Sequence, residues 1–374
     1  MNKQIRHSWL LLALLMLLLT ACSSSDGDGK AKPTLSIYVY APAHPVVTRS
    51  GETADGTSEE TNIHKLQIWI YKTGTEERIG YLELDEAQLA NLNSTLHQEV
   101  FRMEIDEEFA SAPSYKRSNV DVYVLANVYT ENCGDAKGER THRATPTEGS
   151  LETTHIAPDY FCPASAEVVK TYGLPMSGVM RNIQVTGESP VLKIETAKLQ
   201  RRVSKIRFVF SSLENKGAVY IDGVELDGNL IPEYEYLFSD ENKFHDTYKA
   251  SKTMLFKDMG EVKTNDNPQS YAYEDNILTF VDKIDKGVQA GLLSEKNVFL
   301  RATNRKLTGN VYYRVGSDVS QRKARFEMTT AGDFDRNHTW IIYGYFQADQ
   351  LDINTVDITP IDDVGSQDHN IYNW

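Results

Sequence analysis

Thr34–Tyr40 reads TLSIYVY, and this alternation of apolar and polar residues is typical of a β-strand with one buried face. Leu35, Ile37 and Val39 fall on one side of the predicted strand, where they would enter a core. Similar segments recur and predict further strands, at residues 63–71, 120–127, 191–194, 202–210, 219–226, 296–301, 309–315, 340–346 and 351–358. The sequence therefore predicts an all-β protein.

The composition lies in the ordinary range for globular proteins. The 374 residues are 40% hydrophobic and 25% charged, which argues against global disorder and against a multi-span membrane protein. The formal net charge is −14, which argues against a nucleic-acid-binding protein, since such a protein would normally have a basic face. Three cysteines against 20 tyrosines and 13 phenylalanines indicate an aromatic core rather than a disulfide scaffold.

The strand pattern breaks near residues 181–190, and the chain is long enough for more than one domain. We expect two tandem β-sandwiches. The N-terminal domain would comprise residues 50–185 and the C-terminal domain residues 186–374.

A few short helices and long loops complete the prediction. Leucines at helical spacing predict a helix within residues 84–97, with Asp85 as its cap. Residues 164–172 predict a second helix. Three polar stretches predict exposed or irregular structure, at residues 50–62, 132–158 and 229–289.

Residues 1–21 have the features of a lipoprotein signal peptide. Lys3 and Arg6 precede a leucine-rich apolar run that is too short to span a bilayer. Leu-Thr-Ala-Cys ends this run and matches a lipobox, so we expect Cys22 to carry the lipid. Ser23 follows instead of aspartate, which favours the outer membrane. The alternative is an ordinary secretory signal with a chance cysteine.

Residues 22–49 then form a polar tether and the strand described above, and we treat them as a propeptide. The two remaining cysteines, Cys133 and Cys162, either pair in the oxidising compartment or stay as free thiols. Neither has the spacing of a metal ligand.

The sequence contains no pattern that supports catalysis, a cofactor or a metal site. Gly-x-Ser-x-Gly, phosphate-loop, His-Glu-x-x-His and Cys-x-x-Cys patterns are all missing. Ser177, within Pro175-Met176-Ser177-Gly178, is expected in a proline turn. Glu233 and Glu235 are interpreted as charges on a solvated loop. We therefore expect a protein that is not an enzyme.

Four short motifs follow the lipobox in order. They are Val122-Tyr123-Val124-Leu125-Ala126-Asn127, Leu174-Pro175-Met176-Ser177-Gly178, Leu199-x-Arg201-x-Val203-x-Lys205-Ile206 and Arg336-Asn337-His338-x-Trp340. This ordered set resembles the fimbrillin family, the type V pilus subunits of Bacteroidales. The resemblance implies two transthyretin-like β-sandwiches and a structural role as a pilus stalk or tip subunit that supports adhesion.

The resemblance also implies how such a subunit matures. Fimbrillins are exported to the outer membrane as surface lipoproteins and are then cut by an arginine-specific protease. Arg49 and Ser50 offer the site for this cut, between a strand and a polar loop. The strand that carries Leu35, Ile37 and Val39 would then be displaced by a strand from another pilus subunit, in a homo- or heteropolymer.

The C-terminal tail has apolar residues at a spacing that suits the donor strand. They are Val356, Ile358, Ile361, Ile371 and Trp374. The alternative is that this tail completes the second sandwich as an edge strand.

Two other roles remain open. A pilus anchor would not polymerise, would keep its lipid and would stay uncut at Arg49. An outer-membrane carbohydrate-binding lipoprotein would expose aromatic residues on one face, for which Trp69 and Trp340 are candidates. Packing in a core explains these two tryptophans more simply.

Overall fold

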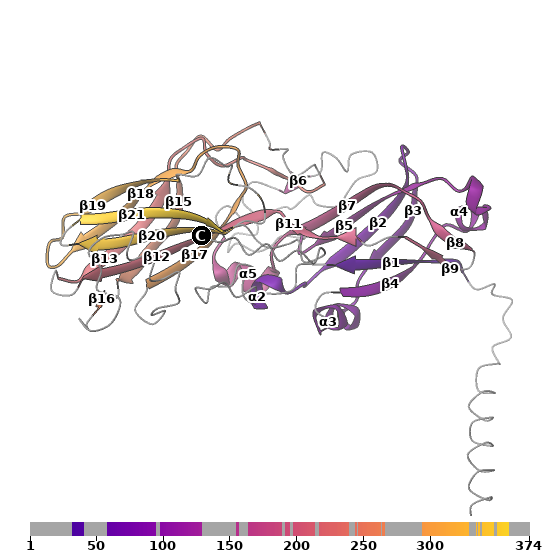
Figure 1. Ribbon diagram of the computed structural model, residues 1–374, viewed down its shortest axis with the longest axis horizontal. Coiled ribbons are helices and arrows are strands. Elements are labelled where there is room, and N and C mark those ends of the chain that lie inside the picture. Colours follow the sequence, from indigo (N-terminus) through magenta and orange to yellow (C-terminus); the bar gives the residue numbers. More distant parts are fainter. Residues whose placement is uncertain are drawn as a thin grey trace, which may run out of the picture.

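The structure is a computed structural model and confirms the all-β fold class. It describes residues 32–40, 58–94, 98–128, 155–156, 164–188, 191–194, 197–213, 217–238, 244, 246–262, 264–265, 294–328, 334, 336, 339–347 and 350–358. Two pairs of sheets lie side by side along the long axis of the molecule (Figure 1). In this described part, no helix is long and apolar enough to cross a membrane.

The first pair of sheets encloses one hydrophobic core. One sheet contains β1 (Thr34–Tyr40), β4 (Gln98–Glu104), β8 (Thr186–Glu188), β9 (Val191–Lys193) and β10 (Ala197–Lys198). The other contains β2 (Leu66–Lys72), β3 (Arg78–Glu83), β5 (Val120–Ala126), β7 (Met176–Ile183) and β11 (Gln200–Arg201). We call this pair the first sandwich.

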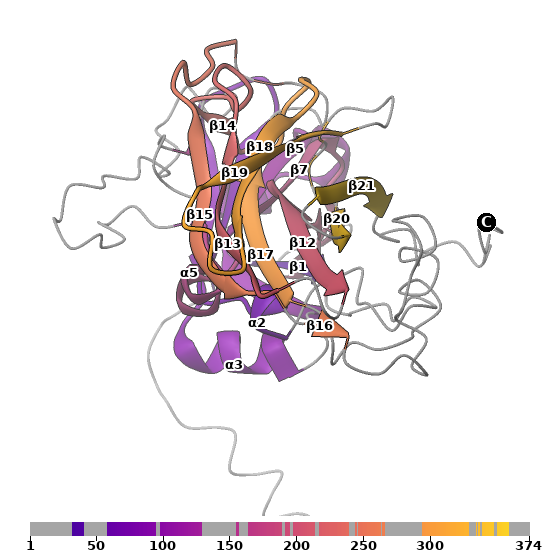
Figure 2. The ribbon, with the colours of Figure 1, turned by 90° about the vertical axis from the view of Figure 1, so that its left-hand side faces the viewer.

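The second pair encloses a separate core and is called the second sandwich (Figure 2). One sheet contains β12 (Val203–Leu213), β16 (Thr264–Asn265), β17 (Ser294–Arg301), β20 (Thr339–Gln347) and β21 (Gln350–Ile358). The other contains β13 (Val219–Leu226), β15 (Thr253–Glu261), β18 (Thr308–Val315) and β19 (Arg322–Glu327). A short ladder joins β6 (His155–Ile156) to β14 (Glu235–Tyr236).

The helices are short and lie outside the sheets. They are α2 (Ser58–Thr61), α3 (Glu86–Ser94), α4 (Glu107–Ser111), α5 (Ala166–Tyr172) and the 3-10 helix η1 (Ser114–Lys116). Asp85 caps α3 as predicted, because its carboxylate accepts from the Gln88 amide at 2.8 Å. The Gln88 side chain accepts from the Asp85 amide in return, which completes a capping box.

Three local predictions are wrong. The expected loop at residues 50–62 contains α2, whose Glu60 is only 6% exposed. Ser177 lies inside β7 rather than in a turn. Gly178 follows it because a Cβ there would lie 2.2 Å from the carbonyl oxygen of Lys198. Glu235 is buried rather than solvated, at 1% exposure.

The sequence also missed strands of the second sandwich, including β15 and β19. β15 lies in the region expected to be irregular, and its ladder to β13 shifts register twice. Such irregularities break the alternation that identifies a strand. β19 (RKARFE) is mostly charged, as is common at the edge of a sheet.

The domain boundary expected after residue 185 does not match the sheets. β8 to β11, at residues 186–201, join the first sandwich: β9 and β10 pair with β1, and β11 pairs with β7. Their segments are two or three residues long, so their partners could not be read from sequence. The sheets divide between β11 and β12.

The two sandwiches are bound to each other by more than the chain that connects them. Phe299 of β17 and Ala164 exchange main-chain hydrogen bonds of 3.0 and 3.1 Å. Leu237 and Phe238 follow β14 and are fully buried in the core of the first sandwich. The ring of Phe238 meets that of Tyr123 edge-on, with 5.2 Å between centroids. Both faces of the sheet that holds β5 are therefore covered.

A buried ion pair also joins the sandwiches. Glu60 of α2 and Lys205 of β12 lie 2.8 Å apart, with side chains 8% and 10% exposed. The ammonium group also lies 5.9 Å from the ring centre of Phe299. α2 and α5 lie between the two sandwiches in Figure 1.

Candidate functional site: the slot of strand β1

β1 is an interior strand of its sheet. All seven of its residues pair with β4 in an antiparallel ladder. On its other side, its first three residues pair with β9 and its last two with β10, both in parallel. We call the space that β1 fills between these strands the slot. Among the described strands, β1 alone joins β4 to β9 and β10, so it holds this sheet together.

The inward side chains of β1 are completely buried. Leu35, Ile37 and Val39 are each 0% exposed, as predicted from their alternation. Phe101 and Met103 of β4 lie opposite two of them and face the same core. Burial of each such side chain contributes about 1.5–3 kcal/mol, an upper estimate because the unfolded chain is already partly compact.

Main-chain hydrogen bonds extend beyond the paired residues at both ends of the slot. Pro33 accepts from the Ile105 amide at 3.2 Å, and Tyr40 accepts from the Leu199 amide at 2.8 Å. Lys32 forms an exposed ion pair with Glu104 at 2.7 Å. The hydrogen bond to Glu104 raises the pKa of Lys32. These contacts hold β1 in a single register.

The chain that follows β1 leads to α2 and β2. Residues 41–57 contain Arg49 and Ser50 and lie outside the described residues, as do Cys22, Cys133 and Cys162. The described chain resumes at α2. Just after this helix, the side chain of Asn93 in α3 accepts from the Ile63 amide and donates to the Ile63 carbonyl, both at 2.9 Å. These two bonds attach the segment after α2 to α3.

The tail predicted as a donor is only partly described. Val356 and Ile358 lie in β21, which pairs with β20 along its whole length. This pairing matches the alternative in which the tail completes the second sandwich. Ile361, Ile371 and Trp374 lie outside the described residues.

The motif residues that suggested a family have structural roles. Asn127 ends β5 in the left-handed region, at φ 57°. Its side chain accepts from the His64 amide at 2.7 Å and donates to the carbonyls of Asn62 and Leu174. Gly173 packs against it, and a Cβ there would lie 2.1 Å from the Asn127 amide nitrogen. These contacts fasten Asn62 and His64 to the first sandwich.

Two other motifs meet where the sandwiches join. Arg202 donates to the hydroxyl of Ser177, which donates to the carbonyl of Leu237. Arg336 pairs with Glu235 at 2.5 Å. Burial raises the pKa of Glu235, while Arg336 and Arg202 oppose this rise. Sequence spacing gave no sign of this network, because its members are up to 159 positions apart.

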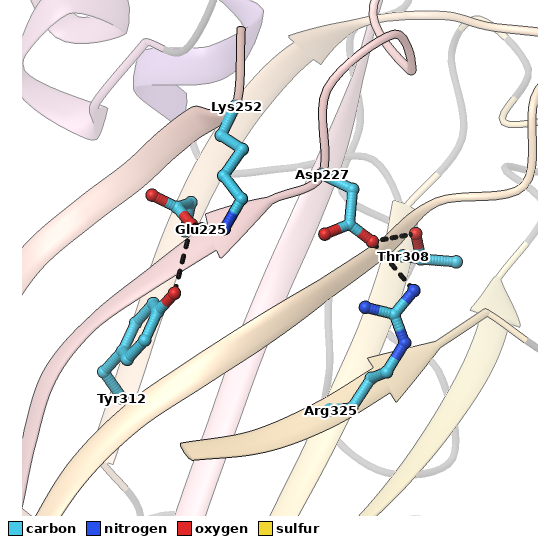
Figure 3. Close-up of polar contacts among 6 residues, drawn as sticks. All are labelled: Glu225, Asp227, Lys252, Thr308, Tyr312 and Arg325. Carbon is cyan, nitrogen blue, oxygen red and sulfur yellow. Dashed lines mark hydrogen bonds and ion pairs between the residues drawn. The ribbon is translucent and has the colours of Figure 1, made fainter. Parts of the chain in front are cut away.

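The outer face of the second sandwich carries polar contacts between neighbouring strands (Figure 3). Glu225 pairs with Lys252 at 2.8 Å and accepts from the Tyr312 hydroxyl at 3.1 Å. Asp227 accepts from Thr308 at 2.5 Å and from Arg325 at 2.8 Å. Each group drawn is satisfied by a neighbour, so the cluster stabilises the sheet rather than forming an open site.

Acid should weaken this cluster. Lys252 lowers the pKa of Glu225, and Thr308 and then Arg325 lower that of Asp227. A carboxyl with a lowered pKa in the folded state contributes stability above its unfolded pKa, near 4, and loses it as pH falls. We expect the double variant Glu225→Gln with Asp227→Asn to be less stable than wild type at pH 7. The difference in urea midpoint between wild type and the double variant should be smaller at pH 3 than at pH 7. An equal difference at both pH values would contradict a stabilising role for the two ionised carboxylates.

Trp69 and Trp340 are each 1% exposed and lie in the two cores. They cannot form an exposed platform for a sugar. The aromatic residues offered in support of a carbohydrate-binding role are therefore core residues, as their simpler interpretation predicted.

No family model matches the sequence, and no curated protein matches it. Several solved structures are similar over most of their length. The tip fimbrial protein Mfa3 from Porphyromonas gingivalis is 11% identical with a TM-score of 0.46; the match covers 88% of this chain and 99% of that one. A putative cell adhesion protein from Parabacteroides distasonis ATCC 8503 is 15% identical with a TM-score of 0.48, covering 88% and 98%. A fimbrial assembly protein from the same strain is 12% identical with a TM-score of 0.47, covering 87% and 96%.

Proposed function

We propose that this chain is a structural, non-enzymatic subunit of a bacterial surface pilus, either stalk or tip, and that it supports adhesion. The observation that carries the proposal is the position of β1. It is an interior strand with three fully buried side chains, yet it precedes every other described element of the chain. The names of the similar structures accord with this role, but the proposal rests on β1 and on the sequence motifs.

Export places the subunit at the outer membrane as a lipoprotein. Cys22 is the acylated residue, and residues 23–31 tether the folded part to the lipid. The tether leads directly into Lys32 and β1, so the lipid and the strand belong to the same segment.

A cut after Arg49 by an arginine-specific protease separates this segment from the mature chain. β1 is then held in its slot only by the ladders, the buried side chains and the ion pair of Lys32. A strand from another subunit can compete for the slot, which a covalently attached β1 would refill at once.

Removal of β1 leaves main-chain groups of β4, β9 and β10 without partners. Such open edges favour addition of a strand from another chain. Because donor and slot are different surfaces, the contact is heterologous and repeats head to tail into a filament. Donation by Val356 and Ile358 would require the end of β21 to leave β20.

The mass of protein released from cells tests the proposal. A mature chain that starts at Ser50, recovered in filaments, supports it. Filaments built from chains that still begin at lipidated Cys22 would overturn the proposed maturation.

Cys22→Ala should abolish lipid attachment. Without the thiol no diacylglycerol is transferred, so the signal peptide should stay attached and the protein should not reach the surface. Metabolic labelling with a fatty acid, followed by surface proteolysis, measures both. Cys133→Ala is the matched control and should label normally, whereas labelling of Cys22→Ala would contradict the assignment.

A further inference from the structure

Two cations flank Ser36 on the outer face of the β1 sheet. Ser36 lies opposite Arg102 of β4 and is also in register with Lys193 of β9. Residues in register point to the same face of a sheet. Arg102 and Lys193 are both exposed, and within the described part of the chain neither charged side chain has an ion-pair or hydrogen-bonding partner.

The residue of β1 between these cations does not neutralise their positive charge. The side chain of Ser36 is small and neutral, so it cannot neutralise either cation. Arg102 and Lys193 lie on either side of β1, so their like charges repel each other across one strand. A carboxylate at the position of Ser36 would lie between Arg102 and Lys193 and could pair with both.

The chain itself contains a segment with this chemistry. Val356-Asp357-Ile358 has an apolar–acidic–apolar order. Aligned with residues 35–37, it places two apolar side chains inward and Asp357 between the cations. The match ends at Pro360, which falls at the position of Val39 and lacks a main-chain donor.

We propose that the slot selects a donor strand with a carboxylate at the position of Ser36. The inference rests on the strand exchange proposed above, in which the C-terminal tail of a second copy is the donor, and it adds the charge by which the slot recognises that tail. The buried positions demand apolar residues of any suitable donor, whereas Arg102 and Lys193 discriminate by charge. Local attraction at this point also offsets the general repulsion between two acidic copies.

Displacement of β1 by peptides tests the selection. The full chain, with a specific protease site in place of residues 47–50, is cut so that β1 stays bound non-covalently. Peptides of residues 34–40 are then added as the natural sequence, as Ser36→Asp and as Ser36→Lys. We expect the Asp peptide to bind about threefold to tenfold more tightly than the natural one, and the Lys peptide more weakly. The differences should shrink at about 1 M NaCl.

Two further experiments test whether the two cations cause the selection and whether the C-terminal tail is the donor. The acceptor variant Arg102→Glu with Lys193→Glu should reverse the order of the three peptides. A peptide of residues 354–361 should also displace β1, and its Asp357→Lys variant should bind about tenfold more weakly.

The outcomes separate the two proposals. Equal binding of the three β1 peptides would overturn charge selection while leaving strand exchange intact. Failure of the 354–361 peptide, with the Asp peptide still preferred, would overturn the second copy as donor. If no peptide displaces β1, the proposed exchange itself fails, and the selection fails with it.

Discussion

Arg49→Ala should block assembly while leaving a folded lipoprotein on the cell surface. Without the arginine the protease cannot cut, so β1 remains covalently attached. A tethered β1 has a high effective concentration at its own slot and excludes any donor. We expect a loss of filaments of at least about 100-fold, measured by electron microscopy and by sedimentation of shed protein.

A matched variant moves the arginine instead of removing it. Thr48→Arg combined with Arg49→Ala should restore the cut one residue earlier and restore filaments. Both variants should keep the wild-type urea midpoint before cutting, since neither substitution changes β1 or the strands that pair with it. Filaments of normal length from Arg49→Ala, with no cut at another nearby basic residue, would contradict the mechanism.

Glu60→Gln should strongly destabilise the protein. Glu60 is the ion-pair partner of Lys205, and both side chains are about nine-tenths buried. Removing one charge leaves the other buried without compensation, which typically costs about 3–5 kcal/mol. Urea unfolding followed by tyrosine and tryptophan fluorescence measures the loss.

The double variant Glu60→Gln with Lys205→Met is the control. Removing both charges avoids the isolated buried cation, so it should recover most of the lost stability. Lys72→Met is a comparison at an exposed pair, with Glu77 54% exposed, and should change stability by less than about 1 kcal/mol. Equal losses at Lys72 and Glu60 would show that burial does not decide the effect.

The ion pair bears on assembly because α2 follows the proposed cut. When β1 leaves, Glu60, Ile63 and His64 lie near the new start of the chain. Their partners are Lys205, Asn93 and Asn127, and none of these lies in β1. The mature chain therefore keeps its first segment fastened after the strand is lost.

The sequence by itself determined the long strands with regular alternation. Leu35, Ile37 and Val39 repeat every second residue, and β1 has the predicted bounds. β13 likewise matches its predicted range at Val219–Leu226. Both were predictable because the two faces of each strand meet different surroundings, and side-chain polarity records that difference. The cap of α3 was predictable for a similar reason, since Asp85 acts within three residues.

Tertiary structure alone decided everything that depends on partners distant in sequence. Glu235 looked like a solvated charge, but a pair with Arg336, about 100 positions away, allows its burial. β8 to β11 were too short to show a pattern, and only the ladders of β9 and β10 to β1, of β11 to β7 and of β8 to β9 place them in the first sandwich. Ser36 became notable only when the fold set Arg102 and Lys193 on either side of it. Local sequence encodes which face of a strand is buried, whereas pairing and charge environment arise from contacts that no local pattern records.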